Sequence, residues 1–270
     1  THHFDRAFAF QLASKGLSLI LLDRDQAQLE ATKRALHQEF GDKIEVRCLV
    51  VDLNKLSKDE IVKAIRDGID GVDVGILINN AGVAYTYPRF LHEADPDATE
   101  SVLNVNAGAP TWATMAVLPS MMKKKRGAIV NMGSASAHVL DAYPLVSIYG
   151  ATKAYIEHFS RSISVEYGRY GIDVQCQAPS YIATKMTRRT QGSLFVPTAE
   201  TWCQASARWI GYDTVCNPYW PHYLMSMVFH MIPNFVLDWY FMRSNLQARD
   251  FYMKKDADRA ESEENGKKII

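Results

Sequence analysis

The chain has 270 residues, 47% of them hydrophobic and 22% charged, and its 30 basic and 30 acidic side chains give a formal net charge of zero. This length and composition suit one large globular α/β domain and exclude a fibrous or disordered chain. The balanced charge gives no sign of a nucleic-acid-binding surface, which needs an excess of basic residues. The cysteines stand far apart without C-x-x-C spacing, so we expect reduced packing residues and no metal site at Cys48, Cys176, Cys203 and Cys216.

The first predicted elements are a helix and a strand. Residues 6–15 read as a helix, and Gly16 ends it. A nucleotide-binding βα unit places a strand and a glycine-rich turn before such a helix, so we expect both to be missing or altered here. Residues 18–22 then predict a buried strand that ends at Asp23 and Arg24. The carboxylate would accept hydrogen bonds from an adenosine ribose, the arginine would pair with a 2′-phosphate, and a solvated pair is the third alternative.

The next predicted strand also ends in a polar group. A predicted helix over residues 26–40 leads to a strand over residues 46–51, which Asp52 closes either as a helix cap or as a cofactor contact. Ser57 and Glu60 have the spacing of a capping box, which opens a helix to about residue 70.

The most specific short motif follows the strand predicted over residues 74–78. It consists of Asn79, Asn80, Ala81 and Gly82. Small residues after a strand let the backbone approach a cofactor, and the two amides can also tie neighbouring strands together. The motif therefore predicts either a cofactor contact or a structural link at this strand end.

A long helical stretch over residues 98–123 contains Asn104 and Asn106. Asparagine is unfavourable in the middle of a helix unless its side chain has a partner. Either residue could point inward, and a capping or surface role is the alternative for both.

A serine, a tyrosine and a lysine are expected to converge after the next strand. Residues 127–132 predict a buried strand, Ser134 lies just past its carboxyl end, and a helix opens near residue 151. Tyr149 and Lys153 are four residues apart and so share a helix face. An ammonium beside a phenol favours the phenolate, which predicts a lowered pKa for Tyr149 and a general acid for a carbonyl oxygen. The hydride would have to come from a nicotinamide.

This pattern resembles the short-chain dehydrogenase/reductase superfamily. From residue 6 onward it resembles one branch closely, the very-long-chain 3-oxoacyl-CoA reductases and especially the plant β-ketoacyl-CoA reductases. The likeness rests on the stretches GILINNAG, AVLPSM, YGATK, GIDVQCQAPSYIATKM and NPYWPH. It implies an α/β fold with a doubly wound, Rossmann-like parallel sheet, whose first strand and glycine-rich turn are truncated or altered here.

The resemblance implies a role for each catalytic candidate. Tyr149 would donate the proton, Lys153 would lower the pKa of Tyr149 and hold the nicotinamide ribose, and Ser134 would polarise the carbonyl. Asn106 would hold a water in a proton relay behind the lysine. Common relatives space serine and tyrosine by thirteen residues, which would select Ser136; we choose Ser134 by its distance from the strand end.

The resemblance also implies a cofactor site. Its residues, besides Tyr149 and Lys153, are Asp23, Arg24, Asp52, Asn79, Ala81, Gly82, Pro179 and Thr184. Arg24 falls where NADP-preferring relatives carry arginine and Asp23 where NAD-preferring relatives carry an acid, so we expect NADPH. In the family's TGxxxGxG turn, His3 and Asp5 would occupy glycine positions, and Asp5 would set a negative charge against the pyrophosphate.

The implied function is the second step of fatty-acid elongation, the NADPH-dependent reduction of a very-long-chain 3-oxoacyl-CoA to the (3R)-3-hydroxyacyl-CoA. The implied partners are the condensing enzyme, the dehydratase and the enoyl reductase at the endoplasmic reticulum membrane. The alternatives are a ketosteroid or retinoid reductase, and a non-catalytic fragment or scaffold that has lost its cofactor loop.

The last part of the chain supports a membrane location. We divide the chain into a Rossmann-like part (1–200), a substrate-covering or membrane-proximal lobe (201–250) and a disordered polar tail (251–270). Residues 220–242 are rich in aromatics and methionine but too interrupted to span a bilayer, which suggests a substrate-covering lobe, an interfacial helix or an ordinary core helix. Lys267 and Lys268 resemble a dilysine retrieval signal, and we expect a preceding segment to carry the membrane anchor, the first strand and the glycine turn.

Overall fold

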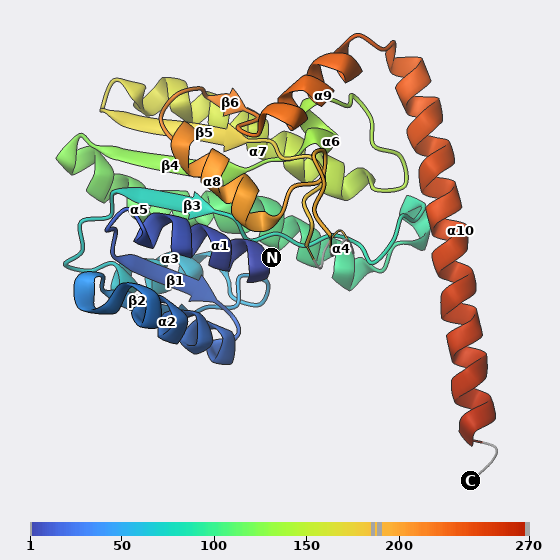
Figure 1. Cartoon of the computed structure of the whole chain (residues 1–270), viewed down its shortest axis with the longest axis horizontal. Coiled ribbons are helices and arrows are strands. Elements are labelled where there is room, and N and C mark those ends of the chain that lie inside the picture. The colour runs from blue at the N-terminus through green and yellow to red at the C-terminus, as the bar shows by residue number, and fades with distance from the viewer. Residues whose placement is uncertain (1, 185–186, 188–190, 268–270) are drawn as a thin grey trace.

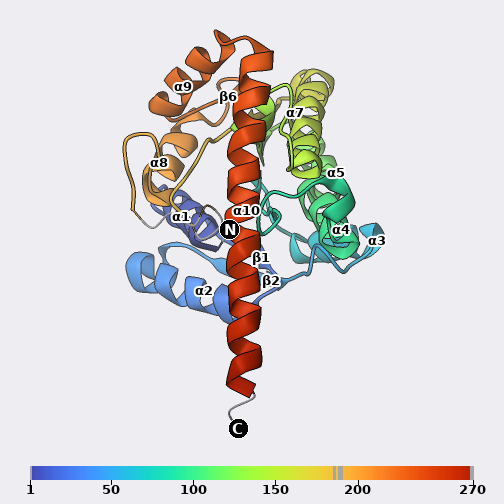
Figure 2. The same cartoon turned by 90° about the vertical axis from the view of Figure 1, so that its right-hand side faces the viewer.

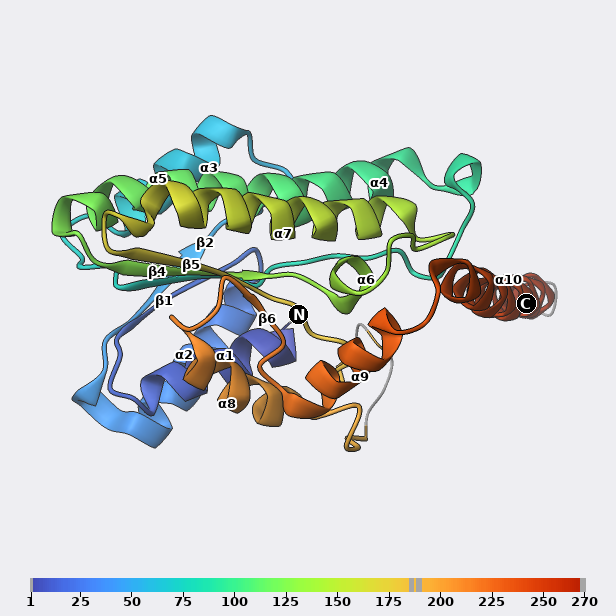
Figure 3. The same cartoon turned by 90° about the horizontal axis from the view of Figure 1, so that it is seen from above.

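The computed structural model describes residues 2–184, 187 and 191–267. It has the predicted α/β architecture, with parallel strands between two layers of helices (Figure 1). The strands are β1 Leu19–Asp23, β2 Val46–Val50, β3 Ile76–Asn79, β4 Gly127–Met132, β5 Ile172–Gln177 and β6 Val215–Cys216. The helices are α1 His2–Ala13, α2 Gln26–Phe40, α3 Lys58–Gly68, α4 Pro96–Leu103, α5 Ala109–Lys124, α6 Ala135–His138, α7 Ser147–Gly168, α8 Ala199–Trp209, α9 Trp220–His230 and α10 Asn234–Lys267. Helices α3, α4, α5 and α7 cover one face of the strands, and α1, α2 and α8 cover the other (Figure 3).

Local sequence signals set most boundaries. Helix α2 and strand β4 have the predicted bounds, and the capping box between Ser57 and Glu60 opens α3. Helix α7 begins at Ser147, earlier than predicted, so that Tyr149 lies in its first turn. The long helix predicted before β4 is interrupted, because a π-helical segment over Asn104–Gly108 separates α4 from α5. Such wide turns are uncommon and frequent at functional sites.

The strands form two separate parallel sheets. One sheet pairs β1 with β2, and the other has the order β3-β4-β5-β6. Among the described residues, no backbone hydrogen bond joins β1 to β3. In a doubly wound sheet, the strands that correspond to β1 and β3 lie on either side of another strand, which is the first one of the usual fold. The break between the two sheets therefore lies where the sequence predicted this usual first strand to be missing or altered.

Helix α1 holds the two sheets together. Phe4 and Phe8 pack with Val130 of β4 and Trp202 of α8 in one buried cluster. Further along the helix, the alanines at positions 9 and 13 join a second cluster with residues of β1, β2 and α2. Helix α1 already begins at His2, four residues before the predicted start. The side chain of His3 lies outside the described residues.

The carboxyl-terminal part differs from the prediction. We expected a disordered tail over residues 251–270, but α10 is one helix from Asn234 to Lys267 that projects past the body of the molecule (Figure 2). Residues 251–267 contain no proline and many strong helix formers, which explains the continuation. Lys268 lies outside the described residues. In the part of the chain that the structure describes, no helix combines the length and the hydrophobicity needed to cross a bilayer.

Candidate active site

The predicted site residues gather at one edge of the strands. Asp23 ends β1, Asp52 follows β2, Asn79 ends β3, Ser134 follows β4, and Pro179 follows β5. Because all strand pairs are parallel, these carboxyl ends point the same way (Figure 1). Ligands of open α/β sheets bind at this edge.

Ser134 is fixed by the start of a short helix. It is the N-cap of α6 in extended backbone conformation, and its Oγ accepts a hydrogen bond from the Ser136 amide at 3.2 Å. The Ser136 hydroxyl donates to the same oxygen at 2.9 Å. The next amide, that of Ala135, donates to the carbonyl of Pro179 at 2.8 Å, which anchors this turn to the end of β5. Ser136 therefore supports Ser134.

Tyr149 reaches Ser134 from the first turn of α7. A hydrogen bond between the two side chains favours the phenolate, but burial outweighs it and raises the pKa of Tyr149 above its usual value. The sequence predicted a lowered pKa through Lys153, and this prediction is wrong for the structure. Lys153 is not among the causes of this shift, and its Nζ lies 5.8 Å from the centroid of the Tyr149 ring. The phenol carries its proton at neutral pH, and its raised pKa makes it a weaker acid in this structure than the sequence predicted.

Lys153 is a buried cation with spare donors. Its side chain is 6% exposed, and burial lowers its pKa to about 8. Among the described residues, its one hydrogen-bond partner is the Met132 carbonyl, 2.8 Å from Nζ. An ammonium has three donors, so two remain for a ligand. This arrangement fits the ribose hydroxyls of a nicotinamide cofactor, which need donors at this strand end.

Asn106 is the more deeply buried of the two asparagines, whereas Asn104 is half-buried and donates to the Asn54 carbonyl at 3.4 Å. Asn106 lies in the π-helical segment and is 1% exposed. Its amide group accepts from the Val83 N–H at 2.8 Å and donates to the Val83 carbonyl at 2.9 Å, with Thr152 Oγ1 as a further acceptor at 3.3 Å. The side chain thus pins the loop after β3 to α7.

The loop after β3 combines a structural link with a close approach. Asn79 donates to Asn131 Oδ1 at 2.7 Å and to Thr114 Oγ1 at 3.3 Å, which ties β3 to β4 and to α5. A Cβ at Gly82 would lie 3.6 Å from Asn106 Oδ1 and 3.8 Å from Lys153 Nζ. Asn79 therefore performs the structural role that the sequence left open, whereas Ala81 and Gly82 leave the backbone accessible beside the lysine.

The ends of β1 and β2 form a more open region. Asp23 Oδ1 accepts from the Asp25 amide at 2.9 Å, and Arg24 is exposed. Asp52 accepts from the Asn54 amide at 3.0 Å, so its carboxylate shapes the turn that precedes α3. All three predicted residues lie at the edge where an adenosine would bind, and none of them is buried.

Asp5 occupies the place nearest to the expected pyrophosphate. It lies in the first turn of α1, and its carboxylate accepts a hydrogen bond from the Asn80 side-chain amide. A carboxylate at a helix N-terminus competes with an anionic ligand for the same dipole. This part of the site fits a dinucleotide less well than the lysine region does.

Pro179 and Thr184 lie on the segment that follows β5. The Thr184 amide donates to Thr187 Oγ1 at 3.2 Å. Sequence reasoning missed the residue that holds this segment. His222 of α9 is fully buried; its Nδ1 accepts from the Ser180 amide at 3.2 Å, and its Nε2 lies 3.2 Å from the Phe195 carbonyl. These bonds fit a neutral ring, and burial lowers its pKa to about 4.

A tyrosine pair also escaped the sequence analysis. Tyr143 is hydrogen-bonded to Tyr181, and burial together with Tyr181 raises the pKa of Tyr143. Tyr149 also raises the pKa of Tyr143, so the pair lies near the Tyr149 phenol. No spacing rule connects these positions, because they come from the loop before α7 and the loop after β5.

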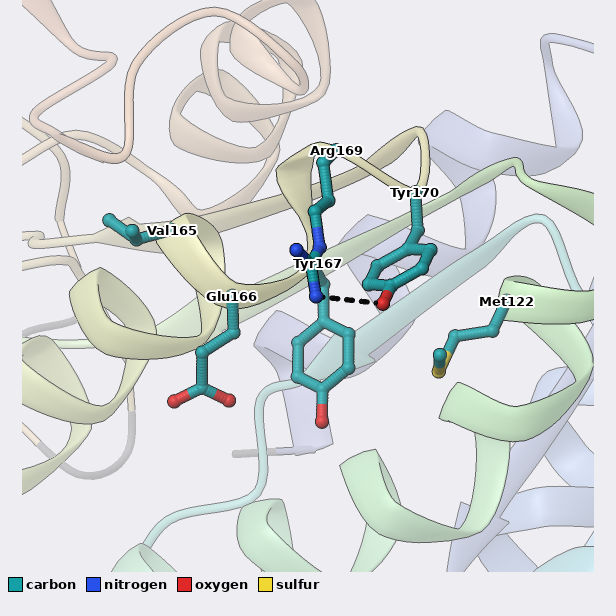
Figure 4. Close-up of a pocket in the computed structure, with 6 residues that line it drawn as sticks. All are labelled: Met122, Val165, Glu166, Tyr167, Arg169 and Tyr170. Carbon is teal, nitrogen blue, oxygen red and sulfur yellow. Dashed lines mark hydrogen bonds between the residues drawn. The ribbon is translucent and has the colours of Figure 1, made fainter.

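A separate surface pocket lies at the far end of α7. It is lined by Met122, Val165, Glu166, Tyr167, Arg169 and Tyr170, and Arg169 donates to the Tyr170 hydroxyl at 2.9 Å (Figure 4). Thirteen residues of helix separate Glu166 from Lys153, about 20 Å at 1.5 Å per residue. It shares no residue with the predicted site. Among the described residues, no cluster of histidine, cysteine and carboxylate side chains could hold a metal ion.

Comparisons with known proteins agree with this geometry. Residues 4–193 match the short chain dehydrogenase family. A very-long-chain 3-oxoacyl-CoA reductase-like protein of Arabidopsis thaliana is 40% identical over 253 residues, which is 92% of this chain and 80% of that protein. A very-long-chain 3-oxoacyl-CoA reductase of Anas platyrhynchos is 32% identical over 257 residues, or 94% and 80% of the two chains.

The fold comparison leads to the same group of proteins. A short-chain dehydrogenase from Sphingobium yanoikuyae, solved in complex with NADPH, is similar with a TM-score of 0.67 and 28% identity, over 78% of this chain and 82% of that one. The family match covers more than half of the chain, and the serine, tyrosine and lysine lie together at the strand edge. The chain therefore belongs to the short-chain dehydrogenase/reductase family and is an oxidoreductase that uses a nicotinamide cofactor.

Proposed function

We propose that the chain reduces a very-long-chain 3-oxoacyl-CoA to the (3R)-3-hydroxyacyl-CoA, with NADPH as the reductant. The observation that carries this proposal is the hydrogen bond between Ser134 and the half-buried phenol of Tyr149, with the Lys153 ammonium near the ring. The names of the two similar reductases support the choice of substrate.

The protein's own residues supply orientation and a proton. Ser134 donates a hydrogen bond to the 3-oxo oxygen, and Tyr149 passes its proton to that oxygen as the carbonyl becomes an alcohol. The cofactor, when bound, supplies a hydride to the carbonyl carbon. Lys153 holds the nicotinamide ribose through its two remaining donors, and Asn106 keeps the adjacent loop in place so that a water can connect the lysine to solvent.

NADPH is preferred to NADH in this proposal because Arg24 is exposed at the end of β1, where it can pair with a 2′-phosphate. Asp23 already accepts a backbone hydrogen bond from Asp25. The remaining contacts are assigned to Asp52, Ala81, Gly82, Pro179 and Thr184. We further propose a location at the endoplasmic reticulum membrane, with the other fatty-acid elongation enzymes as partners.

The test compares two tyrosine variants of α7. Tyr149→Phe should reduce kcat for a 3-oxoacyl-CoA at least about a hundredfold, because the proton donor is lost, while NADPH affinity changes only a few-fold. Tyr155→Phe is the matched control, since Tyr155 is 43% exposed and its hydroxyl meets Thr111 at 2.9 Å. Oxidation of NADPH and NADH is followed by nicotinamide fluorescence.

Other results would decide between the remaining functions. Normal turnover by the Tyr149 variant would remove this residue from the mechanism. Reduction of a ketosteroid or retinal but of no 3-oxoacyl-CoA would keep the chemistry and replace the substrate. A folded chain that binds neither NADPH nor NADH would indicate a non-catalytic scaffold.

A further inference from the structure

Helix α9 buries polar side chains and directs large apolar side chains outward. Its inward face carries two buried polar residues, His222 and Ser226, beside Pro221, and their hydrogen bonds lead to Ser180, Phe195 and Asn217. Its outward face is a stripe of large apolar residues at helical spacing. The stripe consists of Trp220, Tyr223, Leu224, Met227, Val228 and Met231, whose exposed fractions range from 47% to 84%. Because the inward hydrogen bonds fix the rotation of the helix, the apolar stripe must face outward.

The beginning of α10 carries further exposed apolar residues. Leu237 and Asn245 face the body, with Asn245 donating to the Pro144 carbonyl at 2.8 Å. Phe235 and Trp239 point elsewhere and are 74% and 61% exposed. Helices α9 and α10 meet at the turn that contains Pro233 (Figure 1). We call the α9 stripe together with Phe235, Val236, Trp239 and Tyr240 the apolar face.

We infer that the apolar face docks on a lipid bilayer surface. This inference deepens the proposed function, because it assigns a surface to the proposed membrane location. It rests on the proposed function for the choice of lipid. Large apolar patches on a protein surface mark interaction sites. A helix with outward aromatic, leucine and methionine residues fits the boundary between headgroups and acyl chains, where its apolar side leaves water without crossing the membrane.

The charge distribution of this segment suits a lipid surface. Between Asp213 and Arg243 the chain carries a single charged side chain, Asp238. The acyl-chain boundary of a bilayer excludes charged side chains, and tryptophan and tyrosine are enriched at the level between headgroups and acyl chains. Arg243 lies at the edge of the apolar face with its guanidinium 5.7 Å from the Trp239 ring centroid. A cation beside a tryptophan suits the level of the lipid phosphates.

The docked surface is linked to the active site. His222 lies on the inward side of α9, and it binds the Ser180 amide directly after the segment that anchors the Ser134 turn. A substrate with a long acyl chain partitions into the bilayer. Docking of α9 on the membrane would therefore place the side of the protein where this substrate enters against the bilayer that holds it.

The experiment measures co-sedimentation with vesicles of phosphatidylcholine, with and without phosphatidylserine. Replacing Trp220, Met231 and Phe235 with serine should lower vesicle binding at least about tenfold. The control replaces Leu91, Val165 and Tyr212, which are similarly exposed at 62%, 84% and 77%, and should leave binding within about twofold. Stronger binding to the vesicles that contain phosphatidylserine than to those without it would support Arg243 as a contact of the lipid headgroups.

A second measurement needs no disruptive variant. Brominated phosphatidylcholine should quench tryptophan fluorescence of the unaltered chain, and the quenching should be lost in Trp220→Phe/Trp239→Phe but retained in Trp209→Phe. No vesicle binding, or binding that the triple variant leaves unchanged, would overturn the inference. The inference would also be overturned if light scattering showed a dimer that the triple variant dissociates and neither protein bound vesicles.

A failure of this inference is distinguishable from a failure of the proposed function. Vesicle binding is measured without substrate or cofactor, and reduction is measured without vesicles on a short, water-soluble 3-oxoacyl-CoA. A chain that binds vesicles but reduces nothing would retain the docking surface and lose the reductase assignment. A chain that reduces the short substrate and ignores vesicles would do the reverse.

Discussion

The two ends of the proposed cofactor site are built differently. At the nicotinamide end, Lys153 and Asn106 are 6% and 1% exposed, and their polar atoms are tied to neighbouring loops. At the adenosine end, Arg24 is exposed and Asp5 sets a negative charge at a helix N-terminus. Proton transfer needs atoms held to a fraction of an ångström, whereas a cofactor tail can be held by several interchangeable contacts. The difference predicts large effects at the first end and small ones at the second.

The largest expected effect comes from Lys153→Met. The variant loses two charge-assisted hydrogen bonds to a cofactor, each worth roughly 2 kcal/mol, and should lower kcat/KM about a thousandfold. Lys63→Met on α3 is the control, because Lys63 is exposed and pairs with Asp67. A loss below about tenfold in steady-state assays would show that the nicotinamide end tolerates change as well.

The second prediction concerns the support of the nicotinamide end. The pKa of His222 is about 4 in the folded chain, below its ordinary value of 6.5, so its stability contribution is complete above pH 6.5. The contribution falls by up to roughly 3 kcal/mol as the pH drops towards 4, because the unfolded chain then binds the proton more tightly.

His222→Gln removes this titration and keeps one donor and one acceptor. We expect urea unfolding of the variant to depend less steeply on pH between 6.5 and 4 than unfolding of the unaltered chain. Equal slopes for the two proteins would show that His222 is not the group that titrates.

A smaller effect is expected at the end of β1. Arg24→Ala should lower the preference for NADPH over NADH about tenfold, the value of one charge-assisted contact to a 2′-phosphate. Arg34→Ala on α2 is the control, because it removes an exposed arginine from the helix that connects β1 to β2. An unchanged preference in fluorescence titrations would assign cofactor choice to Asp23 or to another residue.

The smallest effect is expected at Asp5. Asp5→Asn retains an acceptor for the Asn80 amide but removes the negative charge beside the helix N-terminus. NADPH should then bind about fivefold more tightly, since a charge at a helix end is worth about 1 kcal/mol. An equal or weaker affinity would mean that the altered turn does not oppose the pyrophosphate, and the two ends would then differ less than their exposure implies.

The edge of the site was predictable from sequence because parallel strands bring their carboxyl ends together. Ser134, Asn79 and Pro179 are far apart in the chain, yet each follows an apolar run that could be recognised as a strand. The spacing of Tyr149 and Lys153 likewise places both on one face of α7 whatever surrounds the helix.

Properties that depend on burial could not be predicted. The pKa of Tyr149 rises instead of falling because desolvation outweighs the hydrogen bond to Ser134, and desolvation is a property of the packed structure. The role of His222 depends on partners 42 and 27 residues away. The apolar stripe of α9 has the same period whether it faces the core or solvent, so only its packed polar side reveals the orientation.

The absence of hydrogen bonds between β1 and β3 has a consequence for how the molecule opens. Contacts between the β1–β2 unit and the larger sheet run through side chains. They lie on α1, whose packing is shared between two clusters, and at Leu22 of β1, which packs against a third cluster with residues of β4 and β5. A unit joined in this way can separate without breaking a continuous backbone ladder. Amide protons of β1 and β2 should therefore exchange with solvent at a lower free energy than those of β4 and β5, and binding of a ligand across both units should narrow the gap.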